Sequence, residues 1–307
     1  MQTIHELEVD RGILASSRNE VYGCIFGRDS LITGLNLLSV YEKNRDPYFL
    51  GLVKKIIVNL AELQGKVVNL ESGEEPGKCI HEYRPEGHEH LTKHPTDPWY
   101  VYPDNIMRNY DSVDSTPLFL MTIHRYFELS GDIETIEKLM PNIRAALTWV
   151  TDHGDSNGDG LIDYRFHPDR KYGGLKTQSW MDSQESVFHE DGAMPEYPIA
   201  PLEVQAYAYN ALRAWSDYFN SRDIETSAVL ASRADSLKKC FNNTFVIKTR
   251  SGVSLAFAID GTMRPLTSAR SSMAHVFWAA RKESDAYDCI LDSEHHAAAL
   301  PGGQVLR

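Results

Sequence analysis

The chain has 307 residues, of which 42% are hydrophobic and 24% are charged, a composition typical of a folded globular protein. A formal net charge of −12 at pH 7 argues against nucleic-acid and anionic-membrane partners, because either partner requires a basic patch. The sequence has no run of about 18 apolar residues, so no transmembrane helix is predicted.

The first half of the chain predicts paired helices. Residues 31–41 are apolar on nearly every side, as in a helix buried all round, and a second helix is predicted over 47–64. The pair recurs as a buried helix over 118–129 and an amphipathic helix over 133–150. In the latter, apolar residues fall at steps of three and four.

The second half continues this pattern and adds small strands. Alternating runs that indicate strands and periodic runs that indicate helices follow one another in this order: strand 162–166, helices 204–219 and 222–241, strand 253–259, helices 267–281 and 283–298. No long series of strands is present. The chain is therefore predicted to be all-α, with small β-hairpins in its loops.

Short turns join these helices into hairpins. Gly131 suits the left-handed conformation that ends a helix, and Asp132 suits the cap of the next one. Hairpins with an inner buried helix and an outer half-exposed helix are typical of a closed α/α toroid. A superhelical array requires a fixed repeat length, which the sequence lacks. We therefore expect one toroidal domain over residues 1–307.

Polar clusters precede three of the predicted inner helices. They are Gly27-Arg28-Asp29-Ser30, Asp111-Ser112-Val113-Asp114-Ser115-Thr116 and Ala200-Pro201-Leu202-Glu203-Val204-Gln205. In a toroid the inner helices run parallel, so these clusters are expected to line one funnel. The alternative is plain helix capping, which does not account for Arg28, because positive charge is disfavoured at a helix N-terminus.

Asp182 is the first candidate catalytic residue. It lies in the polar loop Gln178-Ser179-Trp180-Met181-Asp182-Ser183. A general acid keeps its proton when its carboxyl group is desolvated or close to other negative charge. Trp180 is a candidate for the apolar wall, and Glu185, Glu190 and Asp191 are candidates for the repulsion. The alternative is a simple loop turn, with Trp180 as a packing residue.

Two further groups are candidates for sugar binding. Arg28 and Asp29 form a donor–acceptor couple for vicinal hydroxyls, although a structural ion pair is the alternative. His81 and Glu82 follow a Gly- and Pro-containing loop. Within the long loop over 65–110, aromatic residues suit stacking on sugar rings or pinning of the loop. The nearby histidines have no accompanying metal-ligand pattern, so a metal site is not expected there.

Residues Asp155 to Asp163 match the first part of a calcium-binding loop. Asp155, Asn157 and Asp159 occupy ligand positions one, three and five, and a glycine follows at position six. The bidentate glutamate of position twelve is replaced by Phe166. A structural calcium ion is therefore a candidate and no other cofactor is expected, while a polar glycine-rich turn is the alternative.

Several motifs, in order along residues 20–280, resemble the catalytic domain of amylo-α-1,6-glucosidase (glycogen-debranching) proteins. They are Phe26-Gly27-Arg28-Asp29-Ser30-Leu31-Ile32-Thr33, Pro76-Gly77-Lys78-Cys79-Ile80-His81-Glu82, Tyr110-Asp111-Ser112-Val113-Asp114-Ser115-Thr116, Trp180-Met181-Asp182-Ser183 and Pro198-Ile199-Ala200-Pro201-Leu202-Glu203-Val204-Gln205. The resemblance implies an (α/α)6 barrel of the six-hairpin glycosidase type and inverting hydrolysis.

The resemblance also implies residue roles. Asp182 matches the general acid, and Arg28 and Asp29 match the pair that holds the terminal glucose. Pocket-lining positions are matched by the following residues: Trp180, Glu203, His81, Glu82 and Asp114.

The sequence departs from this family's pattern at its C-terminal end. The general base is expected after the segments resembled by 258–261 and 271–275, but the chain stops at Arg307. We therefore expect an incomplete barrel that lacks its last hairpins, with residues 299–304 forming a tail. The base is expected beyond Arg307, with Glu203 as the candidate within the chain. Inner helices left open in this way predict self-association.

These observations predict a debranching-type glycoside hydrolase. Its expected substrate is α-linked glucose, in particular glucose in α-1,6 linkage, in a glycogen-like oligo- or polysaccharide. The alternatives are a carbohydrate-binding relative that lacks the base, or a glucoamylase-, trehalase- or processing α-glucosidase-like activity. The four scattered cysteines and the lack of a signal-peptide pattern predict a cytoplasmic protein with reduced thiols.

Overall fold

A computed structural model describes residues 2–183, 185–249, 252–283 and 286–292. Two compact units are present. The first comprises Met1–Trp149 and Phe166–Leu175, and the second comprises Val150–Arg165 and Lys176–Arg307. The predicted tail at 299–304 lies outside the described residues.

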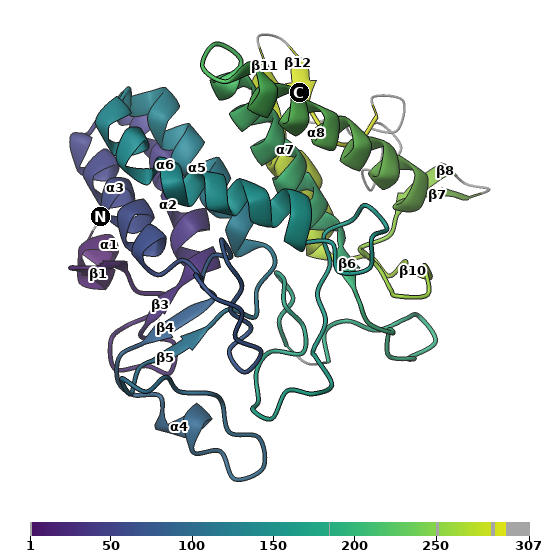
Figure 1. Ribbon diagram of the computed structural model, residues 1–307, viewed down its shortest axis with the longest axis horizontal. Coiled ribbons are helices and arrows are strands. Elements are labelled where there is room, and N and C mark those ends of the chain that lie inside the picture. Colours follow the sequence, from purple (N-terminus) through teal and green to yellow (C-terminus); the bar gives the residue numbers. More distant parts are fainter. Residues whose placement is uncertain (1, 184, 250–251, 284–285, 293–307) are drawn as a thin grey trace. The chain divides into compact units, whose positions relative to one another are not determined.

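Two helical hairpins form the body of the first unit (Figure 1). They consist of α2 (Gly27–Asn44) with α3 (Pro47–Glu62), and α5 (Ser115–Ser130) with α6 (Ile133–Thr148). Helices α2 and α5 pack against each other. Gly131 ends α5 with φ 66°, and the Asp132 side chain caps α6 by accepting the N–H of Thr135. This turn confirms the pairing predicted from the sequence.

In the first unit, a small antiparallel sheet holds the start of α2 in position. A three-stranded antiparallel sheet consists of β3 (Ile25–Phe26), β4 (Glu82–Arg84) and β5 (Met107–Asn109), with β4 in the centre. Phe26 pairs with Glu82, and β3 leads directly into α2. The remaining elements are α1 (Gln2–Leu7), β1 (Glu8–Val9), β2 (Gly12–Ile13) and α4 (Glu89–Thr92).

A third hairpin, α7 (Leu202–Phe219) with α8 (Ile224–Thr244), forms the body of the second unit (Figure 1). A sheet with the order β10–β9–β6 lies at the start of α7. Its strands are β6 (Ala200–Pro201), β9 (Ala258–Ile259) and β10 (Pro265–Leu266). The other elements are β7 (Val246–Thr249), β8 (Gly252–Leu255), η2 (Ser271–Ala274), α9 (His275–Trp278), β11 (Arg281–Glu283) and β12 (Ala286–Asp288). The π-helical turn η1 (Trp149–His153) follows α6.

The predicted fold class is confirmed, since helical hairpins dominate and the sheets are small. The strands predicted over 253–259 are present as β8 and β9, whereas 162–166 contributes only a single bridge, from Tyr164 to Ile199. Among the described residues, no helix has the length and apolar character needed to cross a membrane.

Two predicted helices are wrong. Residues 267–281 contain only the short turns η2 and α9, because the neighbouring β10 pairs with β9 and the aromatic residues of α9 pack on Tyr207 of α7. Such tertiary contacts override local helix propensity. Of the range 283–298, Glu283 ends β11, Ala286–Asp288 forms β12 and residues 289–292 are coil, whereas residues 284–285 and 293–298 lie outside the described residues.

Candidate active site

The N-terminal ends of α2 and α5 meet through a buried ion pair. Arg28 lies in the first turn of α2, and its Nη1 donates to Oδ2 of Asp114 at 3.0 Å. Asp114 directly precedes α5 and is fully buried, and Arg28 is 7% exposed. The carboxylate offsets the unfavourable position of a cation at a helix N-terminus. Two of the three predicted polar clusters therefore lie together.

Serine hydroxyls hold the Asp114 carboxylate in place. Ser112 donates its hydroxyl to Oδ1 of Asp114, and the Ser112 and Ser115 hydroxyls lie 2.7 Å apart. Both serines are fully buried. The cluster thus forms a hydrogen-bonded network that fixes the orientation of the carboxylate.

Gly27 allows the backbone of Ile80 and His81 to pack against the start of α2. A Cβ atom at Gly27 would lie 2.0 Å from the carbonyl oxygen of Ile80, so only glycine fits. The Gly27 N–H donates to the His81 carbonyl at 2.8 Å. Burial, followed by the positive charges of Arg28 and Lys78, holds the pKa of His81 well below its ordinary value. His81 is therefore a buried neutral imidazole, and its Nδ1 has no hydrogen-bond partner.

The other two sugar-binding candidates of this unit have different surroundings. Glu82 is buried and accepts hydrogen bonds from Nε of Arg84 and from the Cys24 thiol. These contacts tie Glu82 to the small sheet. Asp29 is exposed beside the buried Arg28.

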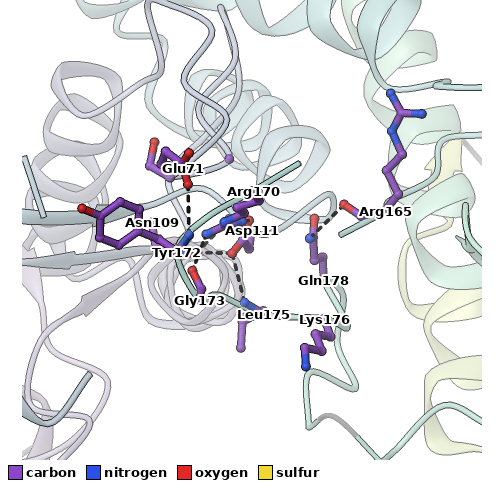
Figure 2. Close-up of polar contacts among 12 residues, drawn as sticks. Glu71, Asn109, Asp111, Arg165, Arg170, Tyr172, Gly173, Leu175, Lys176 and Gln178 are labelled. Carbon is purple, nitrogen blue, oxygen red and sulfur yellow. Dashed lines mark hydrogen bonds and ion pairs between the residues drawn. The ribbon is translucent and has the colours of Figure 1, made fainter. Parts of the chain in front are cut away.

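Asp111 forms a structural hub that sequence reasoning missed (Figure 2). Its carboxylate accepts hydrogen bonds from Nη1 of Arg170 at 2.7 Å, from Nδ2 of Asn109 at 2.8 Å and from the Leu175 N–H at 3.0 Å. The side chains of Asp111 and Arg170 are 2% and 3% exposed, respectively. Gly174 packs so closely that a Cβ atom there would lie 2.2 Å from Asp111 Oδ2. Asp111 therefore anchors the segment Phe166–Leu175 within the first unit.

In the second unit, aromatic side chains surround the loop that carries Asp182. Asp182 is half-buried and Trp180 is 38% exposed. The Trp180 ring lies 4.7 Å from the ring of His275, measured between centroids. His275 Nδ1 is hydrogen-bonded to the hydroxyl of the buried Tyr207 on α7. Sequence reasoning assigned no role to Tyr207 or His275, because only the fold brings them together.

The far end of this loop is fastened to the β9–β10 hairpin. His189 Nε2 and Asp260 Oδ2 lie 3.0 Å apart and are both buried. Arg264 donates to Asp191 at 2.8 Å and holds the pKa of Asp191 below its ordinary value. Thr267 donates to Glu190 at 2.8 Å. The carboxylates of Glu190 and Asp191, predicted to repel Asp182, are thus engaged by other residues.

Glu203 lies in the first turn of α7 and is 1% exposed. Burial, followed by the charges of Tyr197 and Glu203, raises the pKa of Tyr164 well above its ordinary value. Gln205, on the same turn, donates to the carbonyl of Ile162 at 2.7 Å. Glu203 is therefore part of a packed helix start.

The predicted site residues thus fall into two groups. The first unit brings Arg28, His81 and Asp114 together, and the second unit places Trp180 and Asp182 in one loop. The single funnel formed by all three polar clusters stays a prediction.

Comparisons with known proteins place these residues in context. A model of the amylo-alpha-1,6-glucosidase family matches residues 99–298. This range contains Asp114, Asp182 and Glu203. No curated protein matches the chain.

Among solved structures, a metal-independent α-mannosidase from Streptococcus pneumoniae is similar at 15% identity and a TM-score of 0.49, covering 79% of this chain and 56% of that chain. A rhamnosidase from Klebsiella oxytoca matches at 13% identity and a TM-score of 0.49, covering 84% of this chain and 38% of that chain. A glucoamylase from Saccharomycopsis fibuligera matches at 18% identity and a TM-score of 0.46, covering 75% and 42%.

The chain therefore spans between 38% and 56% of the length of these solved structures. The family model, in contrast, matches well over half of the chain itself and includes the loop of Asp182 and the clusters at the starts of α5 and α7. On that match, the chain belongs to the amylo-alpha-1,6-glucosidase family and is a glycosidase-family domain.

Proposed function

We propose that this chain takes part in inverting hydrolysis of α-linked glucose, at α-1,6 branches of a glycogen-like polysaccharide in particular. The observation that carries the proposal is the family match over residues 99–298, which includes Asp114, Asp182 and Glu203. The neutral sugar units of such a substrate suit a chain of net charge −12.

In this proposal, the first unit supplies hydrogen bonds to a glucose ring. Arg28 is always charged and presents donors in a rigid planar arrangement. Asp114 fixes one of its nitrogens at 3.0 Å, which orients the guanidinium plane for binding sugar hydroxyls. The neutral His81 adds an imidazole without a further positive charge. Asp29, exposed beside Arg28, supplies an acceptor.

Within the second unit, the proposal assigns the role of general acid to Asp182. Asp182 donates a proton to the leaving glycosidic oxygen, as the general acid of an inverting enzyme does. The exposed face of Trp180, backed by His275, suits stacking against a sugar ring. Hydrolysis with inversion also needs a carboxylate about 6.5–9.5 Å from the acid to activate water. Glu203 is the candidate for this base within the chain.

The test is glucose release from glycogen limit dextrin, isomaltose-type, maltose-type and trehalose substrates. We expect Asp182→Asn to lower the rate by about 10²–10⁴-fold, the usual contribution of a positioned general acid. Glu196→Gln is the matched control, because it removes an exposed carboxylate of the same unit that has no part in the proposed site. It should leave the rate unchanged.

Two outcomes would contradict the proposal. Glucose release that survives Asp182→Asn would remove Asp182 as the acid. Retained binding of the oligosaccharides without release of glucose would identify a carbohydrate-binding relative. Glu203→Gln then tests the base, since loss of turnover with unchanged substrate affinity is expected only if this carboxylate activates water.

A further inference from the structure

Residues 155–163 of the second unit form a tight loop around the Asp155 carboxylate. Oδ1 of Asp155 accepts the Gly158 N–H at 2.7 Å, and Oδ2 accepts the Gly160 N–H at 2.8 Å. Both glycines have positive φ values, 79° and 92°, which side chains rarely adopt. The Asn157 and Asp159 side chains accept N–H groups of residues 159 and 161. Side-chain oxygens of alternate residues are thus held on one short loop.

Asp163 supplies an observation that the loop geometry does not explain. It is 5% exposed, and its Oδ2 accepts the Ser156 N–H at 3.2 Å. Its Oδ1 is buried and has no hydrogen-bond partner. A buried carboxylate oxygen without a partner is costly unless a cation or a proton satisfies it.

We propose that this loop binds one Ca²⁺ ion, with Asp155, Asn157 and Asp159 as side-chain ligands, the Leu161 carbonyl as a main-chain ligand, and Asp163 binding through water. These residues occupy positions one, three, five, seven and nine of a calcium loop. The inference does not depend on the proposed hydrolysis.

The composition of the donor set favours calcium. Among the described residues, no three His, Cys, Asp or Glu side chains are arranged to hold a metal ion by themselves. The shell therefore needs the Asn157 amide, a carbonyl and water beside the carboxylates. Such mixed oxygen shells suit Ca²⁺, whereas Mg²⁺ demands near-ideal octahedral geometry and Zn²⁺ prefers nitrogen and sulfur.

The loop is hydrogen-bonded to the start of α7, and Arg165, two residues after the loop, is hydrogen-bonded to the segment that carries Asp182. The amide of Gln205 accepts the Ile162 N–H at 2.9 Å and donates to the Ile162 carbonyl at 2.7 Å. Gln205 lies two residues after Glu203 in α7. Gln178, in the loop of Asp182, donates to the Arg165 carbonyl at 3.4 Å (Figure 2). Calcium binding is therefore expected to order both segments.

The experiment is calorimetric titration of the full chain, stripped with EDTA, with CaCl₂ and separately with MgCl₂, in the absence of any sugar. We expect one Ca²⁺ per chain with a Kd of about 10⁻⁵–10⁻³ M, because the bidentate ligand of position twelve is missing. Asp159→Asn should weaken binding by about ten-fold or more. Asp152→Asn, which removes an exposed carboxylate just before the loop, is the matched control and should bind as the parent does.

Thermal unfolding separates loss of binding from loss of fold. In EDTA, Asp159→Asn should unfold at nearly the same temperature as the parent, and only the parent should gain stability on addition of calcium. Should Asp159→Asn not fold, Asp163→Asn takes its place. Three results would each overturn the proposal. They are no heat of binding with millimolar CaCl₂, equal affinities for Ca²⁺ and Mg²⁺, and unchanged Ca²⁺ affinity of the folded variant. None of these readouts involves glucose release, so failure of the proposed hydrolysis is distinguishable.

Discussion

A neutral histidine beside an arginine is the most unusual residue-scale feature of the first unit. His81 is buried, lies near the charges of Arg28 and Lys78, and leaves Nδ1 without a hydrogen bond. Protonation there would add a third positive charge in a desolvated space. The imidazole therefore resists protonation for as long as the unit is folded.

This resistance predicts a pH dependence of stability. Above pH 6.5 His81 is neutral in both states and contributes no pH dependence. Below pH 6.5 the unfolded chain takes up a proton that the folded chain refuses, so the free energy of unfolding falls as the pH falls. The slope due to this residue approaches about 1.4 kcal/mol per pH unit. Urea unfolding between pH 7 and pH 5 measures it.

His81→Gln should flatten this slope, because the amide does not titrate. His153→Gln, which replaces an exposed histidine, should leave it unchanged. Equal slopes for the parent and His81→Gln would show that His81 titrates normally in the folded state.

Contacts between residues could be predicted where each residue lies in a local pattern, such as the start of a helix. They could not be predicted where only the tertiary fold brings the residues together. Arg28 and Asp114 were predicted to lie together, because each stands at the start of an apolar helix, and the 3.0 Å contact confirms it. The pairing of Arg170 with Asp111 spans 59 residues and has no local sequence signal. The same is true of Tyr207 and His275, 68 residues apart.

At the scale of elements, capping residues define the hairpins. Asp132 caps α6 through the N–H and hydroxyl of Thr135, and Asp223 caps α8 through the same two groups of Thr226. Asp132 also accepts hydrogen bonds from Lys54 of α3 and Tyr126 of α5. One carboxylate thereby links three helices of the first unit.

These two caps allow a matched comparison. Asp223→Ala should cost about 1 kcal/mol of stability, the usual value for a lost helix cap. Asp132→Ala should cost roughly 1 kcal/mol more, because the contacts with Lys54 and Tyr126 are lost as well. Thermal or urea unfolding of both variants at pH 7 measures the difference. Equal losses would show that the contacts with Lys54 and Tyr126 contribute nothing.

Helices with clear apolar periodicity were predicted well, whereas the region after residue 260 was not. The helices α2, α3, α5, α6, α7 and α8 all lie where periodicity placed them. Residues 267–281 also show helical spacing, but Leu266 pairs with Ala258 in a hairpin and α9 lasts for one turn. Strand β9 of this hairpin also pairs with the distant strand β6, and such pairing cannot be deduced from a local pattern.

At the scale of the whole molecule, the two units share the chain in alternating pieces. The first unit takes Phe166–Leu175 from the middle of the second, and Arg170 fixes this piece by its buried contact with Asp111. Removing the guanidinium leaves a buried carboxylate without its cation, which is strongly destabilising.

Arg170→Gln should therefore loosen the segment Phe166–Leu175. The expected result is faster amide hydrogen exchange at Leu175, whose N–H donates to Asp111, together with a lower unfolding temperature. Arg165→Gln, which replaces an exposed arginine five residues upstream, is the control. Unchanged exchange at Leu175 in Arg170→Gln would show that other contacts hold the segment.

The alternating pieces also impose an order on synthesis. Asp111 leaves the ribosome 59 residues before Arg170, which corresponds to about 3–12 seconds at typical translation rates. During that interval the Asp111 carboxylate lacks its partner Arg170 and must stay hydrated. The residues that bury it in the folded protein therefore cannot yet pack around it. The first unit is thus completed only after the start of the second has been made, and the two cannot fold strictly one after the other from the N-terminus.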